Sequence, residues 1–101
     1  MEAKLPEATA IHLAADDNVG IVTSDLRPTT EIHVGGRLVT VQDPIPFGHK
    51  IALLPIAAGA VVMKFGVPIG RAKADISPGE HVHMHNLESS YINNAVDHYE
   101  S

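Results

Sequence analysis

The sequence contains no cysteine and no tryptophan, and its aromatic residues are limited to two Phe and two Tyr. The absence of cysteine excludes disulfide frameworks, thiol catalysis and zinc sites built on Cys ligands. Basic residues are also scarce, with seven Lys and Arg against twelve Asp and Glu and a formal net charge of −5. Because nucleic acids and anionic membranes are both bound mainly through Lys and Arg, we expect neither of them as a partner.

Long apolar runs are missing as well. The longest, 51–63, contains Pro55 and Gly59 and is shorter than the ~20 residues that a bilayer span requires. Residues 1–7 lack the basic segment and apolar core of a signal peptide. A chain of about one hundred residues corresponds to one hydrophobic core, so we expect a soluble single-domain protein in the cytoplasm.

Eight Gly and seven Pro punctuate the chain, and the short runs between them are rich in Val and Ile. This arrangement is typical of an all-β domain of short strands and hairpins, and we find no internal repeat. Gly35-Gly36 separates two such runs and predicts a tight hairpin, because both central residues of a type I′ turn need a positive φ. The predicted strands are Ala10–Ala14, Val19–Ser24, Glu31–Val34, Arg37–Gln42, Lys50–Ile56, Val61–Phe65, Ile69–Ile76 and His81–His85.

Strand-like alternation stops near the end of the chain. Ile92, Ala95, Val96 and Tyr99 fall at i, i+3, i+4 and i+7, which allows a short C-terminal helix. We therefore divide the chain into an N-terminal arm (1–9), a β domain (10–89) and a C-terminal tail (90–101).

The seven histidines are numerous for so short a chain, and three of them alternate in one segment. On a strand, His81, His83 and His85 would point to one face, about 7 Å apart. Three imidazoles on one face are typical of a site for a metal or an anionic substrate. They are equally typical of the polar face of a half-buried edge strand. A site would combine two of the three with a ligand from elsewhere, because three ligands on one strand rarely converge.

Other polar residues carry two interpretations each. His49 and Lys50 place a titratable base beside a fixed positive charge, or belong to an ordinary exposed loop. Asp17 and Asn18 belong to a site or to an Asx-type turn that enters a strand. Arg71 follows two glycines and is a candidate partner for a carboxylate.

Taken in order, four segments resemble one known module: Asp17–Val19, Gly48–Leu53, Lys64–Ala72 and Gly79–Asn86. The resemblance is to the SAF-type domain of the altronate and galactarate dehydratase family, and it covers roughly residues 10–89. The ending Val82-His83-Met84-His85-Asn86 resembles the altronate and sulfolactate branch of that family rather than the galactarate branch.

The resemblance implies a β-clip fold and a division of labour between two regions. In this family the domain accompanies a much larger catalytic region, which is either fused or a separate subunit. We therefore expect a stand-alone small subunit of an altronate dehydratase-like hydro-lyase that is not catalytic alone. The alternatives are the small subunit of a sulfolactate sulfo-lyase, and a non-catalytic SAF module for substrate binding or regulation. An independent metal enzyme of the cupin type fits least, because no second Gly-rich motif with its own histidine follows.

The resemblance also implies partners, a cofactor and residue roles. The expected partners are a large catalytic subunit and a sugar-acid or sulfolactate substrate, and exposed hairpin edges favour self-association or docking. We expect Fe²⁺ or Mn²⁺ in the full complex and no tightly bound metal in the isolated chain. The expected roles are catalysis by His49, His83 and His85, metal binding by His83 and His85 together with the large subunit, and substrate binding by Lys50, Arg71, Asn86, Asp17 and Asn18.

Overall fold

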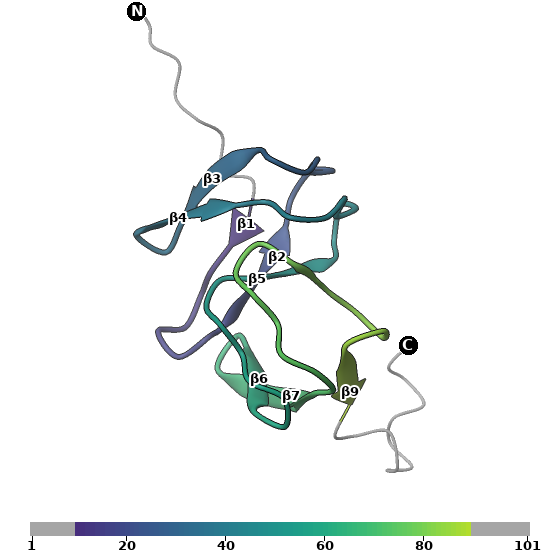
Figure 1. Cartoon of the computed structure of the whole chain (residues 1–101). Coiled ribbons are helices and arrows are strands. Elements are labelled where there is room, and N and C mark those ends of the chain that lie inside the picture. Colours follow the sequence, from purple (N-terminus) through teal and green to yellow (C-terminus); the bar gives the residue numbers. More distant parts are fainter. Residues whose placement is uncertain (1–9, 90–101) are drawn as a thin grey trace, which may run out of the picture.

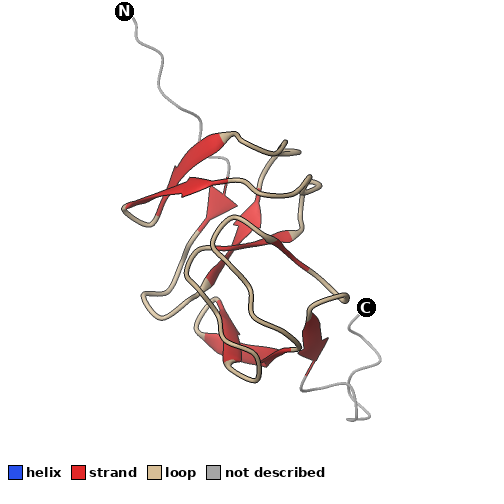
Figure 2. Ribbon diagram, viewed as in Figure 1, coloured by secondary structure: helices blue, strands red, loops and turns tan. Residues whose placement is uncertain are grey.

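The computed structural model describes residues 10–89, and these residues form strands, turns and loops without any helix (Figure 2). The all-β prediction is therefore confirmed, and the described part of the chain has no helix that could cross a membrane. The predicted arm, tail and C-terminal helix lie outside the described residues. The strands are β1 (Ala10–Ile11), β2 (Val19–Val22), β3 (Glu31–Val34), β4 (Arg37–Thr40), β5 (Lys50–Ala52), β6 (Val61–Lys64), β7 (Val67–Ala72), β8 (His81–Val82) and β9 (Leu87–Ser89).

The strands pair antiparallel in three small sheets, ordered β1-β2-β5-β8, β3-β4 and β6-β7-β9. Figure 1 shows the β3–β4 hairpin at one end of the domain and β6, β7 and β9 at the other, with β1, β2 and β5 between them. The predicted hairpin is present: Val34 pairs with Arg37, and Gly35 and Gly36 have φ values of 60° and 80°. Positive φ at both positions is the geometry for which the glycine pair was expected.

The apolar residues form two buried clusters, one toward each end of the domain. Short strands of this kind are stable only when their apolar faces pack against other elements. The first cluster comprises Ala10, Val22, Leu26, Ile32, Val34, Val39, Val41, Ile45, Ile51 and Leu53. The second comprises Val19, Ala52, Ile56, Val62, Ala72, Ile76 and Val82. Strands β2 and β5 contribute residues to both clusters and therefore join the two ends.

The backbone hydrogen bonds repeat along the chain, contrary to the expectation of no internal repeat. Leu26 and Ile45 exchange two backbone hydrogen bonds of 2.8 and 3.0 Å, and Ile56 and Ile76 exchange two of 2.8 Å. Three residues after each pair, a glycine N–H bonds back to an earlier strand. Gly48 donates to the carbonyl of Val22 at the end of β2, and Gly79 donates to the carbonyl of Ala52 at the end of β5, both at 2.8 Å. Backbone pairing requires apolar residues at matching positions rather than identical side chains, so the sequence carries only a short trace of the duplication, an isoleucine three residues before a glycine in Ile45–Gly48 and in Ile76–Gly79.

Several predicted strands are too long, and one strand was missed. The prediction His81–His85 is wrong beyond Val82, because the chain turns there: the N–H groups of Asn86 and Leu87 both donate to the carbonyl of His83. The turn leads into β9, which pairs with β7. The predicted ends of Val19–Ser24, Lys50–Ile56 and Ile69–Ile76 are likewise wrong, because β2, β5 and β7 end at Val22, Ala52 and Ala72. The residues that follow them enter the loops that contain the Leu26–Ile45 and Ile56–Ile76 bridges.

Candidate functional site

Four histidines, His49, His81, His83 and His85, come together at one end of the β5–β8 pair, and we call them the histidine cluster. Lys50 pairs with Val82 in this antiparallel ladder. His49 immediately precedes Lys50 and His83 immediately follows Val82, so the antiparallel direction places these two histidines opposite each other. The pairing of β5 with β8 therefore joins two segments that are more than thirty residues apart.

The imidazole rings are in direct contact. The His49 and His83 rings stack with centroids 4.4 Å apart, and His81 stacks on His83 at 5.3 Å. Nδ1 of His49 and Nε2 of His81 lie 2.9 Å apart, so one carries the proton and donates to the other. His85 is exposed and reaches His81 with a ring separation of 5.4 Å.

Asn86 and Asp43 hold the backbone beneath these rings. The buried Asn86 side chain accepts from the N–H of His83 and donates to the carbonyl of His81, both at 2.9 Å. Asp43 accepts from the N–H of His81 at 2.9 Å. Asn86, expected to bind substrate, thus has both ends of its amide engaged by the backbone that carries two of the histidines.

Burial and mutual proximity lower the basicity of the site. Burial lowers the pKa of His83, and the neighbouring charges of His49, Lys50 and His85 lower it further. Burial also lowers the pKa of His81, with contributions from the other three histidines and an opposing one from Asp43. The pKa of Lys50 is lowered by burial and by Lys64. Neutral imidazoles have free lone pairs, which is the state needed to accept a proton or to bind a metal.

The donor set fits a divalent transition metal ion. His49, His81 and His83 each offer one nitrogen, and these three atoms lie within 4.8 Å of one another. An all-imidazole set suits Zn²⁺, Co²⁺ and Ni²⁺, whereas Mn²⁺ prefers oxygen ligands. Within residues 10–89 this group contains His81, which was not among the expected metal ligands, and it lacks His85, which was. The alternating spacing of the histidines was the signal that pointed to His81.

The Asp17 and Asn18 side chains are engaged mainly with the backbone of the β6–β7 hairpin, rather than with an Asx-type turn of their own or an open site. The carboxylate of Asp17 accepts from the N–H groups of Phe65 at 2.8 Å, Gly66 at 2.7 Å and Ala14 at 3.2 Å. Burial raises the pKa of Asp17, but these backbone hydrogen bonds and the nearby His12 outweigh it, so the pKa is lowered overall. Asn18 accepts from the N–H of Met63 and donates to the carbonyl of Val61.

Arg71 lies on β7, in a different sheet from the histidine cluster. Its guanidinium donates to the carbonyl of Gly59 at 2.9 Å, and the side chain is exposed. Of the expected substrate-binding residues, two lie at the histidine cluster: Asn86 bonds to the backbone of His81 and His83, and Lys50 follows His49 and lowers the pKa of His83 through its charge.

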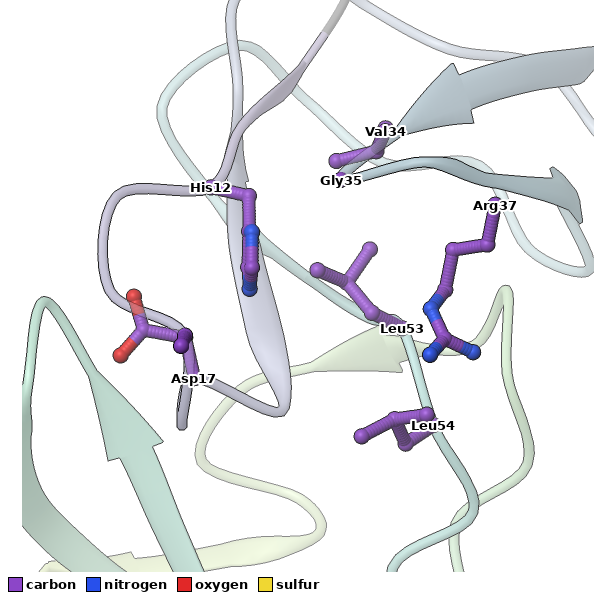
Figure 3. A pocket seen from close by; sticks show the side chains of 8 residues that line it. His12, Asp17, Val34, Gly35, Arg37, Leu53 and Leu54 are labelled. Atoms are coloured by element: carbon purple, nitrogen blue, oxygen red, sulfur yellow. The ribbon is translucent and has the colours of Figure 1, made fainter.

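A separate cavity of about 250 Å³ lies near the β3–β4 turn. Figure 3 shows His12 and Arg37 on two sides of it, with Leu53 and Leu54 between them. Gly35 packs so closely on His12 that an added Cβ would lie 2.8 Å from Nδ1 of that ring. No sequence motif predicted this cavity, because its lining comes from three separate segments.

Comparison with known proteins supports the resemblance. Residues 8–90 match the family model of the altronate/galactarate dehydratase SAF domain. The chain is 46% identical over 80 residues to altronate dehydratase of Escherichia coli (strain K12), which covers 79% of this chain and 16% of that protein. It is 40% identical over 80 residues to altronate dehydratase of Bacillus subtilis (strain 168), with the same two coverages.

A relative of similar size is also found. The chain is 37% identical over 82 residues to (2R)-sulfolactate sulfo-lyase subunit alpha of Chromohalobacter salexigens, covering 74% of this chain and 87% of that subunit. The described domain therefore spans about a sixth of the altronate dehydratases and most of the sulfo-lyase subunit.

Proposed function

The chain belongs to the altronate/galactarate dehydratase SAF domain family, and on this premise we propose that it is the small subunit of a sugar-acid dehydratase. In this proposal it contributes the histidine cluster to an active site that a large catalytic chain completes. The observation that carries the proposal is the convergence of His49, His81 and His83 in a domain that matches 16% of the altronate dehydratases. In this proposal, another chain supplies the rest of such an enzyme.

The reaction is an elimination next to a carboxylate. The C–H bond beside the carboxylate breaks and its proton goes to a base, while the C–O bond on the next carbon breaks and the hydroxyl leaves as water. The neutral imidazole of His83 is suited to accept the proton, because burial and neighbouring charges lower its pKa. His85, which is exposed and lies beside His81, is the candidate for passing a proton to the leaving group.

Lys50 is the proposed anchor for the substrate carboxylate. It is half-buried, and it neighbours the cluster through His83. A cation in a partly desolvated position attracts a carboxylate more strongly than one in water, because the local dielectric is lower. Arg71 stays a prediction as a second anchor, which would act only if the substrate or the large chain spans the two sheets.

A divalent ion, Fe²⁺ or Mn²⁺, is part of the proposal for the full complex. When bound, it would stabilise the negative charge that develops on the substrate carboxylate during elimination. His49 and His81 would hold it from this chain, which leaves His83 free to accept the proton, and the oxygen ligands that Fe²⁺ and Mn²⁺ accept would come from the large chain. The cytoplasmic location likewise stays a prediction.

A second candidate is the small subunit of a sulfolactate sulfo-lyase, in which sulfite leaves in place of water. It is favoured by the match to 87% of a subunit that bears this name. The two candidates share the proton acceptor and differ in the bond that breaks, so the histidine cluster serves both.

The test is reconstitution with a large catalytic chain of the same family encoded beside this one. We expect the two chains to co-purify, and their mixture to release water from altronate or sulfite from (2R)-sulfolactate, with neither chain active alone. Sulfite release would select the second candidate. Failure of the two chains to associate, or full activity of the large chain alone, would contradict both candidates and favour a binding or regulatory module.

A further inference from the structure

We propose that His49, His81 and His83 form a three-nitrogen site that binds a borderline transition metal ion, Co²⁺, Ni²⁺ or Zn²⁺, in this chain without a partner. The inference deepens the proposed function, and its catalytic meaning rests on that function. The binding itself depends only on residues of this chain. It departs from the expectation that the isolated chain holds no tightly bound metal, and it does so for Co²⁺, Ni²⁺ and Zn²⁺, which imidazole ligands bind more strongly than Fe²⁺ or Mn²⁺.

The ligands come from two segments, which removes the geometric objection to ligands on one strand. His49 precedes β5, whereas His81 begins β8 and His83 follows it. The chain also turns after Val82, so His83 is not fixed at the 7 Å spacing of a regular strand. Three nitrogens can therefore approach a common centre from two directions.

The distances agree with this reading. Two nitrogens bound to one ion at ~2.1 Å lie about 3.0 Å apart at a right angle and about 3.4 Å apart at the tetrahedral angle. Nδ1 of His49 and Nε2 of His81 are 2.9 Å apart, as in such a pair. All three nitrogens lie within 4.8 Å of one another, and rotation of the half-buried rings can bring them to the shorter separations of a bound ion.

The backbone of the ligands is already fixed. Asn86 bonds to the carbonyl of His81 and the N–H of His83, and Asp43 accepts from the N–H of His81. Partners that orient ligands in this way raise metal affinity, because less conformational entropy is lost on binding. Three ligands leave coordination positions open, and an open position is what distinguishes a catalytic metal site from a structural one.

The competing reading is a metal-free stack of hydrogen-bonded imidazoles, which the 4.4 Å contact of His49 with His83 also satisfies. The two readings differ in their response to an added ion. A metal-free stack would bind Co²⁺ no better than scattered surface histidines.

The experiment titrates the full, untagged chain with Co²⁺, following visible absorption and calorimetry. We expect one ion per chain, and a loss of affinity of at least about 10–100-fold in His49→Gln and in His81→Gln. Circular dichroism shows whether each variant is folded. The matched control is His33→Gln, an exposed residue of β3 outside the cluster, which should bind as the parent does.

His85→Gln separates the two possible ligand sets. If the site is the one proposed, this variant keeps its ion while His81→Gln loses it. The proposal is overturned if the folded parent binds no stoichiometric ion, or if His85→Gln loses the ion and His81→Gln does not. An active complex with a large chain, formed from a small chain that binds no Co²⁺, would leave the proposed function standing and refute only the metal site.

Discussion

At the residue scale, the polar residues of this domain divide into those that hold the backbone and those that present free nitrogens. Asp17, Asn18, Asp43 and Asn86 all accept hydrogen bonds from backbone N–H groups. The histidine cluster differs, because its rings contact mainly one another. Two of these rings, His81 and His83, are partly buried and have lowered pKa values, which is typical of functional sites.

The structural role of Asp17 is tested by Asp17→Asn. The variant places an amide NH₂ against backbone donors, so we expect a loss of about 1–3 kcal/mol in the free energy of unfolding at pH 7. Urea denaturation measures it. The matched control is Asp16→Asn, an exposed neighbour, which should change the stability little. Equal effects of both substitutions would show that the hydrogen bonds of Asp17 contribute nothing specific.

The same residue predicts a pH dependence. The folded pKa of Asp17 is lowered, so its contribution to stability is present above the ordinary value of 3.8 and is lost as the pH falls through the lower folded pKa. The stability difference between the parent and Asp17→Asn should therefore persist from neutral pH to about pH 4 and shrink below it. A difference that grows on acidification would have the wrong sign for this account.

Lys50 is tested through substrate affinity in the reconstituted complex. Lys50→Met keeps the length of the side chain and removes its charge, so we expect KM to rise about tenfold with a smaller change in kcat. Lys73→Met is the control, because Lys73 donates to the carbonyl of Met84 and lies outside the proposed substrate contacts. A fall in kcat at constant KM would instead place Lys50 in the chemical step.

At the element scale, the position of the site depends on close packing between loops. A methyl group on Gly79 would overlap the carbonyl oxygen of Thr40, and the φ of Gly79 is 92°. Gly79 lies two residues before His81, and its carbonyl accepts from Gln42 at 2.8 Å. The loop that leads into His81 therefore packs tightly against the end of β4.

Gly79→Ala should destabilise the domain by more than about 3 kcal/mol, since it combines a backbone collision with an unfavourable φ. Gly36→Ala is the matched control: its φ is 80°, but nothing lies within 4 Å of an added Cβ, so it should cost only about 1–2 kcal/mol. Thermal unfolding of both variants measures the contrast. Similar losses of stability in the two variants would mean that the unfavourable φ alone explains the effect and that Thr40 can move away from the added methyl group.

The sequence predicted elements better than it predicted their ends. Gly35-Gly36 fixed a hairpin because turn chemistry is local. The alternation of His81, His83 and His85 predicted a longer strand than the one present, because a turn closed by Asn86 is invisible to a two-residue period. The partnership of His49 with His81 was equally hidden, since it depends on the pairing of β5 with β8. Long-range pairing is what local patterns do not encode.

At the scale of the whole molecule, the histidine cluster is a consequence of the duplicated hydrogen-bond pattern. The first half closes onto β2 through Gly48, and the second closes onto β5 through Gly79. The segments that follow these closures, β5 and β8, become neighbours in one sheet. His49, which follows the first closure, is thereby brought together with His81 and His83, which follow the second.

The measurement that tests the account most directly is turnover by the reconstituted complex of this chain with the proposed large catalytic chain, comparing the parent with His83→Gln. If His83 accepts the proton in an active site shared by the two chains, His83→Gln should still assemble and should lose at least about 100-fold in kcat. His33→Gln, outside the cluster, should keep the parent rate. A His83→Gln complex that assembles and turns over at the parent rate would contradict the central claim.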